Sequence, residues 1–241
     1  WAEAKEMSDK GHEMSNHSWS HPNMTTLSED ELKEQIRKND EAILANLGKP
    51  STTFCFPYNA YNDAVLAEVM KGRIGARLKE FWLGGQHSPK EYLQKQIEDA
   101  LAAGSWIVGM THGINYGYDC YEDASEFTDF LDYLKSLEDR IWIGTFRDVA
   151  AYTAVAKGIS LDISKDGKEI TVVPATNLDR TLYETPLTLE VNTDGKKIKA
   201  QQDGKKIYRL NIGQPDLPTP QAFYDAIRDF DEKTLAYEAS P

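Results

Sequence analysis

The sequence has few cysteines, a deficit of positive charge and no long apolar run. Its 241 residues hold 27 Lys and Arg against 39 Asp and Glu, which gives a formal net charge of −12. A nucleic-acid surface requires clustered basic side chains, so this balance argues against a nucleic-acid partner. No apolar stretch approaches the roughly 20 residues of a membrane-spanning helix, so the sequence predicts no membrane span.

The two cysteines, Cys55 and Cys120, lie far apart and form no Cys-x-x-Cys pair. They therefore fit neither a zinc knuckle nor a disulfide framework, and they leave the cellular compartment open. The chain opens on Trp1, with no initiator Met and no charged-then-apolar leader of a signal peptide. We expect it to be part of a longer protein. The sequence does not indicate an oligomeric state.

The clearest chemical signal is the run His-Ser-Trp-Ser-His at residues 17–21. On a helix, this spacing places both imidazoles on one face, about 5–6 Å apart at Cβ. Two such ring nitrogens can bind one divalent cation, most simply Zn²⁺, which polarises carbonyls and activates water. The pair supplies only part of the usual three-ligand catalytic site. His12 is a further imidazole candidate, or an ordinary polar residue at the end of the preceding helix.

Apolar periodicity and turn signals predict alternating helices and strands. The predicted helices span 1–10, 24–47, 63–71, 88–103, 124–137 and 148–157. The predicted strands span 51–56, 74–78, 106–111 and 141–146. Ser28 with Glu31 forms a capping-box pattern, and Ser88 before Pro89 marks another helix start. Apolar strands that alternate with helices are typical of an α/β fold with a parallel sheet.

The pattern changes after residue 157. Short β-type runs and Asp-Gly turns predict a small β-rich appendage, such as a sandwich, over residues 158–204. The runs are 159–163, 169–173 and 187–191, and the turns lie at 166–167 and 194–195. From residue 205 the chain reads as a Pro-rich loop and a helix. We therefore expect three segments, 1–157, 158–204 and 205–241.

Three motifs together resemble a known family. Residues 11–21, Gly-His-Glu-Met-Ser-Asn-His-Ser-Trp-Ser-His, are similar to the metal-binding motif of the polysaccharide deacetylases (carbohydrate esterase family 4, NodB homology). Phe-Cys-Phe-Pro-Tyr at 54–58 resembles the family's Arg-Pro-Pro-Tyr motif. Ile-Val-Gly-Met-Thr-His-Gly at 107–113 resembles the strand end that carries the catalytic histidine. The resemblance covers about residues 1–157.

The resemblance implies a distorted (β/α) barrel that binds one divalent cation, usually Zn²⁺. The enzyme would remove acetyl groups from a polysaccharide or oligosaccharide, in an extracellular or periplasmic location. His17 and His21 would be metal ligands. The backbone N–H of Tyr58 would stabilise the tetrahedral oxyanion. His112 would protonate the leaving amine or alkoxide as general acid.

Each of these residues also has a purely structural interpretation. His112 follows a predicted buried strand, which favours a site residue over a histidine that caps a strand end. Pro57 and Tyr58 would wall the site, although Pro-Tyr is common in turns. Arg77 is a candidate to replace the motif arginine, where this chain has cysteine, but it also reads as a surface arginine. Trp82 is a candidate for the acetyl pocket, or else a core residue.

The family's first motif, Thr-Phe-Asp-Asp-Gly, does not occur in the 241 residues. In the family it supplies the general base and the third metal ligand. We therefore expect a barrel that lacks its first strands and is inactive or nearly so. A deacetylase-like module that binds glycans without chemistry is the alternative.

Residues 205–241 resemble a second family. Asn-Ile-Gly-Gln-Pro-Asp at 211–216, followed by Pro218 and Pro220, is similar to the N-terminal segment of fold-type I aminotransferases, which use pyridoxal phosphate. Tyr237 would then reach toward the cofactor. The large domain with the Schiff-base lysine is absent from the sequence, so this segment alone cannot transaminate. An aminotransferase fragment and a Pro-rich linker with an amphipathic helix are the two interpretations.

Overall fold

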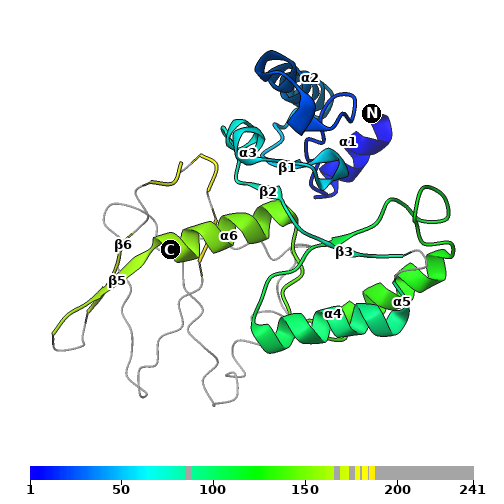
Figure 1. Ribbon diagram of the computed structural model, residues 1–241. Coiled ribbons are helices and arrows are strands. Elements are labelled where there is room, and N and C mark those ends of the chain that lie inside the picture. Colours follow the sequence, from blue (N-terminus) through cyan, green and yellow to red (C-terminus); the bar gives the residue numbers. More distant parts are fainter. Residues whose placement is uncertain (85–87, 166–168, 174–176, 180, 184, 188–241) are drawn as a thin grey trace, which may run out of the picture. The chain divides into compact units, whose positions relative to one another are not determined.

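The computed structural model describes residues 1–84, 88–165, 169–173, 177–179, 181–183 and 185–187. Helices and strands alternate through most of this part (Figure 1). The helices are α1 (Ala2–Asp9), α2 (Glu29–Leu47), α3 (Asp63–Val69), α4 (Lys90–Ala103), α5 (Ala124–Lys135) and α6 (Phe146–Gly158). The strands are β1 (Thr53–Cys55), β2 (Gly75–Arg77), β3 (Phe81–Trp82), β4 (Gly109–Met110), β5 (Ser160–Ile163) and β6 (Ile170–Val173).

The first four strands form two parallel pairs. β1 pairs with β2 across helix α3, with Cys55 opposite Arg77, and β3 pairs with β4 across helix α4, with Trp82 opposite Met110. Each pair is a strand–helix–strand unit, so the predicted α/β character with parallel strands is confirmed. Within the described residues the strands remain in two-stranded sheets, and no closed barrel is present.

Helix α2 begins where the capping signal predicts. The Ser28 side chain accepts from the backbone of Glu31, and the Glu31 carboxylate accepts from the backbone of Ser28. An apolar stripe along the helix is buried, and its members are Leu32, Ile36, Ile43 and Leu47. Leu32 and Ile36 pack with Phe54 of β1 in one hydrophobic cluster. This packing anchors the helix beside the strand that follows the histidine pair.

A second hydrophobic cluster joins α4 and α5 to strand β3. Leu93 and Ile97 of α4 are buried with Phe130 of α5 and with Phe81 of β3. The buried ring of Tyr121 belongs to the same cluster. The two helices lie side by side (Figure 1), and their cluster supports the segment after β4 that carries His112.

The predicted cap at Ser88 is wrong. The N-cap position of α4 is Pro89, without a side-chain cap, and the helix begins at Lys90. The Ser88 hydroxyl instead donates to the carbonyl of Trp82 at 2.8 Å. It therefore ties the start of α4 to strand β3, which is a tertiary contact that a local pattern does not reveal.

Two predicted strands are shorter or absent. Of residues 106–111, only Gly109–Met110 forms a paired strand. The Trp106 ring packs on the Phe146 ring of α6 at a centroid distance of 5.0 Å. Residues 141–145 form no strand, and Trp142 and Ile143 are 57% and 58% exposed. This apolar run has no described strand as a neighbour, and it leads directly into α6.

Beyond α6 the described chain forms one antiparallel hairpin. Ser160 of β5 pairs with Val173 of β6, and Ile163 pairs with Ile170. The predicted β-type runs 159–163 and 169–173 therefore form strands, and the wider appendage over residues 158–204 stays a prediction. Both predicted Asp-Gly turns and residues 188–191 of the third run lie outside the described residues. No described helix is long and apolar enough to cross a membrane.

Candidate functional site

His17 and His21 lie in a loop, so the predicted helical face is wrong. Ser18 and His21 have positive φ values of 67° and 59°, which are incompatible with a right-handed helix. Pro22 follows directly and disfavours helical backbone at His21. The loop nevertheless brings the two imidazoles together. Their ring centroids are 4.8 Å apart in an edge-to-face arrangement.

Asn16 holds this loop in place through hydrogen bonds. Its side chain is fully buried, and its Oδ1 accepts from the Ser18 backbone N–H at 2.8 Å. The Ser18 hydroxyl oxygen in turn accepts from the His21 backbone N–H at 3.0 Å. Two consecutive hydrogen bonds therefore fix the backbone that carries both histidines.

A buried ion pair supports Asn16. Its Nδ2 donates to Asp40 of α2 at 2.7 Å, and Asp40 also pairs with Arg73, whose side chain is 5% exposed. The Arg73 guanidinium lies over the Phe54 ring, 5.6 Å from its centroid. A buried charge is stable only when it is paired and hydrogen-bonded. The Arg73 guanidinium is paired with the partly exposed Asp40 carboxylate and donates to the Val69 carbonyl at 3.1 Å, while its Nε has no hydrogen-bond partner among the described residues.

His17 is oriented by a backbone carbonyl. Its Nδ1 lies 2.8 Å from the Cys55 oxygen, and because a carbonyl can only accept, Nδ1 carries the proton and Nε2 is left to bind a cation. Burial is the main cause that lowers the pKa of His17, and the neighbouring His21, Arg77 and His112 lower it further, against the Cys55 hydrogen bond. A neutral imidazole is the form that binds metal.

Tyr58 lies beside His21 on a strained turn. The ring centroids of the two residues are 4.6 Å apart, and Tyr58 has a left-handed backbone with φ 58°. Pro57 before it is fully buried, whereas the Tyr58 ring is exposed. Strained backbone of this kind often occurs at functional sites. The role of the Tyr58 N–H in binding an oxyanion remains a prediction.

Arg77 is not an ordinary surface arginine. It lies opposite Cys55 in the β1–β2 register, and it forms a 2.8 Å ion pair with Glu80 in which the side chains are 11% and 7% exposed. Asn59 bridges the pair, because it donates to Glu80 and accepts from Arg77. The Arg77 charge also acts on His17. The structure therefore places Arg77 near the histidine pair.

Trp82 and His112 are brought together by the β3–β4 pair. Their ring centroids are 5.6 Å apart, and the Tyr118 ring packs edge-on against His112 at a centroid distance of 5.3 Å. Trp82 is half-buried and His112 is exposed. The contact agrees with a shared site, while the acetyl-pocket role of Trp82 remains a prediction.

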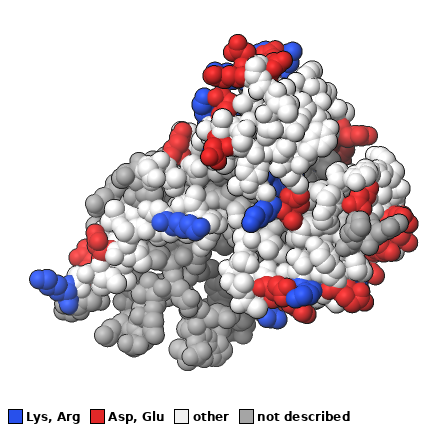
Figure 2. Space-filling model, viewed as in Figure 1, with Lys and Arg blue, Asp and Glu red and all other residues white. Residues whose placement is uncertain are grey.

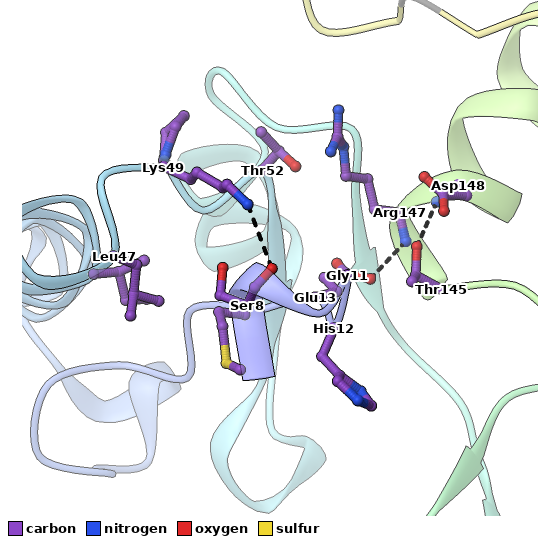
Figure 3. A pocket seen from close by; sticks show the side chains of 13 residues that line it. Ser8, Gly11, His12, Glu13, Leu47, Lys49, Thr52, Thr145, Arg147 and Asp148 are labelled. Carbon is purple, nitrogen blue, oxygen red and sulfur yellow. Dashed lines mark hydrogen bonds between the residues drawn. The ribbon is translucent and has the colours of Figure 1, made fainter. Parts of the chain in front are cut away.

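No group of three or more His, Cys, Asp or Glu is placed to share a metal ion in the described part of the chain. His12 is not a third imidazole of the pair. It lies at the end of α1, where its backbone N–H donates to Met7 at 3.1 Å, and it lines a separate pocket (Figure 3). Within the described residues, the imidazoles that lie together are those of His17 and His21.

The pocket in Figure 3 lies between the loop before β1 and the start of α6. The Glu13 carboxylate accepts from the Arg147 backbone N–H at 2.9 Å and from the Thr53 hydroxyl. Thr145 caps the same helix by accepting from the Asp148 N–H at 3.1 Å. Because Glu13 already neutralises this helix N-terminus, the pocket is a structural junction.

Sequence reasoning missed Asn16, Asp40, Arg73 and Glu80. A signal exists for Asp40, which interrupts the apolar stripe of α2 between Ile36 and Ile43. A charged residue on a buried helical face requires a partner. Arg73 and Asn16 carry no comparable local signal, because both contact Asp40 from distant positions in the sequence. Glu80 pairs with Arg77 three residues away, outside any helix, where this spacing predicts no contact.

The sequence model of the polysaccharide deacetylase family matches residues 1–73 of this chain. The peptidoglycan-N-acetylglucosamine deacetylase PgdA of Listeria monocytogenes is 38% identical over 61 residues, which cover 25% of this chain and 13% of PgdA. The peptidoglycan-N-acetylmuramic acid deacetylase PdaA of Bacillus subtilis is 27% identical over 116 residues, 48% of this chain and 36% of PdaA. The chain therefore spans well under half of these curated relatives.

A solved structure from Mycobacterium smegmatis, assigned as a polysaccharide deacetylase, superposes with a TM-score of 0.51. It is 12% identical, and the match covers 64% of this chain and 66% of that one, so it supports the fold alone. Together the comparisons show that the first part of this chain is similar to polysaccharide deacetylases. The aminotransferase resemblance of residues 205–241 finds no support in them, and that segment lies outside the described residues.

Proposed function

We propose that this chain carries a metal-dependent site that removes acetyl groups from a polysaccharide or oligosaccharide. The observation that carries the proposal is the paired imidazoles of His17 and His21, with His17 oriented by the Cys55 carbonyl. The match of residues 1–73 to the deacetylase family supports it. The relatives are named for peptidoglycan, a cell-wall polymer, which supports an extracellular or periplasmic location.

The residues fit a divalent cation, most simply Zn²⁺, at the histidine pair. His17 and His21 would hold it, and His17 does so in its neutral form because burial lowers its pKa. When bound, the ion supplies Lewis acidity toward the acetyl carbonyl and lowers the pKa of water. The hydrogen bonds through Asn16 and Ser18 keep the loop in place for this task.

The remaining roles fall to residues around the pair. The exposed His112 imidazole donates a proton to the leaving amine or alkoxide. The Tyr58 N–H donates to the oxyanion, and Pro57 and Trp82 wall the acetyl group. The Arg77 guanidinium is held by its ion pair with Glu80, and it orients the polar groups of the site.

We also propose that the described strand–helix–strand units belong to a distorted (β/α) barrel. The parallel β1–β2 and β3–β4 pairs support this. Because the 241 residues contain no Thr-Phe-Asp-Asp-Gly, and the described part shows no third ligand, we expect weak zinc retention and slow turnover from this chain.

Acetate release tests the function. The full chain is incubated with acetylated chitooligosaccharide or acetylated xylan, with and without added Zn²⁺, beside the His17→Ala and His112→Ala variants. We expect slow release that requires zinc and is lost in both variants. The Leu161→Ala variant, which removes an exposed side chain from β5, is the matched control and keeps the wild-type rate.

Release that is independent of zinc and of both histidines contradicts the proposed site. Wild-type turnover in the ordinary enzymatic range of about 1–10³ s⁻¹ contradicts the expected impairment. No release, together with glycan affinity that survives His17→Ala and His21→Ala, identifies a non-catalytic glycan-binding module instead.

A further inference from the structure

The loop that follows His112 exposes two aromatic rings. Tyr116 is 84% exposed and Tyr118 is 78% exposed. The Tyr118 ring also packs edge-on against His112, and the His112 ring contacts Trp82 as well. Trp82 of strand β3, His112 and Tyr118 therefore form one cluster of rings, of which Tyr118 is largely exposed. Exposed apolar surface of this kind next to a candidate site marks a place for a ligand.

Hydrogen bonds fix the backbone of this loop. The Asn115 N–H donates to the Tyr121 carbonyl at 2.7 Å, and the Tyr121 N–H donates back to Gly113 at 3.1 Å. The Asn115 side chain accepts from the first residue of α5, Ala124, at 3.1 Å. The Tyr121 ring is buried in the core. Rings presented by such a cross-linked turn lose little freedom on binding.

The charge around this loop restricts the ligand. Residues 113–134 contain no Lys or Arg, and their acidic residues are Asp119, Glu122, Asp123, Glu126, Asp129 and Asp132. Acidic side chains are prominent on the face viewed in Figure 2, toward the α5 region. An anionic glycan would be repelled here, whereas an uncharged sugar would not. The apolar C–H face of a pyranose can stack on an aromatic ring while its hydroxyls stay in water.

We propose that Tyr116 and Tyr118 form a stacking subsite for an uncharged, N-acetylated sugar of a glycan chain. This subsite rests on the proposed function for its place beside His112. The subsite extends the site along the glycan, because the sugar next to the reacting one stacks on the tyrosines of the loop. The chain then selects neutral oligosaccharides over uronate-rich ones.

Binding measured without turnover tests the subsite. The full chain is treated with EDTA, and the Kd for N-acetylchitotetraose is measured by isothermal titration calorimetry. We expect Tyr116→Ala to weaken binding about tenfold, the loss expected when an aromatic anchor is truncated. Tyr116→Phe keeps the ring and is expected to keep the Kd. Trp1→Ala removes an exposed ring elsewhere and is expected to leave the Kd unchanged.

Three outcomes overturn the subsite. They are no binding by the wild type up to millimolar ligand, an unchanged Kd in Tyr116→Ala, and equal or tighter binding of an oligogalacturonate. Acetate release is measured separately. If it is absent while Tyr116 still controls binding, the deacetylase function fails and the sugar subsite stands.

Discussion

Asn16 determines where the two histidines lie. Its buried side chain accepts from Ser18 and donates to Asp40, and its backbone N–H donates to the Ser51 hydroxyl at 2.8 Å. The Asp40 contact joins the histidine loop to α2, and the Ser51 contact joins it to the segment before β1. The side chain of Asn16 is therefore a positioning group for the proposed ligands, although it touches neither ring.

We predict that Asn16→Ala lowers the free energy of unfolding by about 1–3 kcal/mol or more, because it leaves buried partners without hydrogen bonds. It should also weaken zinc binding, because the loop loses its support. Urea unfolding and zinc titration measure the two effects. Asn46→Ala, on the exposed face of α2, is the control and should change neither. A wild-type unfolding midpoint in Asn16→Ala would contradict the positioning role.

At the scale of residues, the sequence predicts candidate site residues but not the residues that hold them in place. His17, His21, Pro57, Tyr58 and His112 stand in recognisable patterns. The support from Asp40 and Arg73 depends on a fold that brings distant positions together, since Arg73 pairs with a residue of another helix. Such partners are invisible to spacing rules, which act over a few residues.

The stability of the start of α2 depends on pH through the Glu31 carboxyl. The hydrogen bonds that Glu31 accepts, first from the Ser28 side chain and then from its backbone, lower the pKa of the Glu31 carboxyl. A carboxyl with a lower pKa in the folded state stabilises the fold above its unfolded pKa. That contribution is lost as the pH falls through the folded pKa.

We predict that Glu31→Ala destabilises the chain at pH 7 and that the difference from wild type shrinks as the pH falls below the ordinary glutamate value of 4.5. Urea unfolding at pH 7 and at acidic pH gives the two differences. A difference that stays constant across this range would show that the capping carboxylate does not act through its charge.

Glu13 stabilises α6 from a distant part of the chain. Its carboxylate accepts from the Arg147 N–H at the start of that helix. We predict that Glu13→Ala lowers the free energy of unfolding by about 1.5–3 kcal/mol, the range for hydrogen bonds to charged groups. Glu13→Gln retains an acceptor and should lose less. Thermal unfolding measures both, and equal melting temperatures of Glu13→Ala and wild type would contradict the contact.

Helix starts were more predictable than strands, for a physical reason. A cap such as Ser28 is satisfied within one helical turn, so its pattern is local. A strand exists only where another strand lies beside it. Residues 106–111 and 141–146 have the composition of buried strands, yet the Trp106 ring packs on Phe146 and the Trp142 ring on Tyr152 instead.

Across the whole molecule, the candidate site combines two strand–helix–strand units. The β1–β2 unit provides the Cys55 carbonyl and Arg77, and the β3–β4 unit provides Trp82 and leads to His112. The effect of His112 on the pKa of His17 connects the two units electrostatically. The order of the motifs predicts one common site, and that remains a prediction. The closure of a barrel depends on strand pairings that sequence spacing does not specify.

Zinc retention by the histidine pair tests the proposed metal site most directly. The full chain and the variants His17→Ala, His21→Ala and His12→Ala are loaded with Zn²⁺, dialysed, and assayed for metal by atomic absorption. We predict that wild type and His12→Ala retain zinc below one ion per chain, and that His17→Ala and His21→Ala retain none above background. Equal zinc in all four proteins, or none in the wild type, would contradict a metal site at His17 and His21.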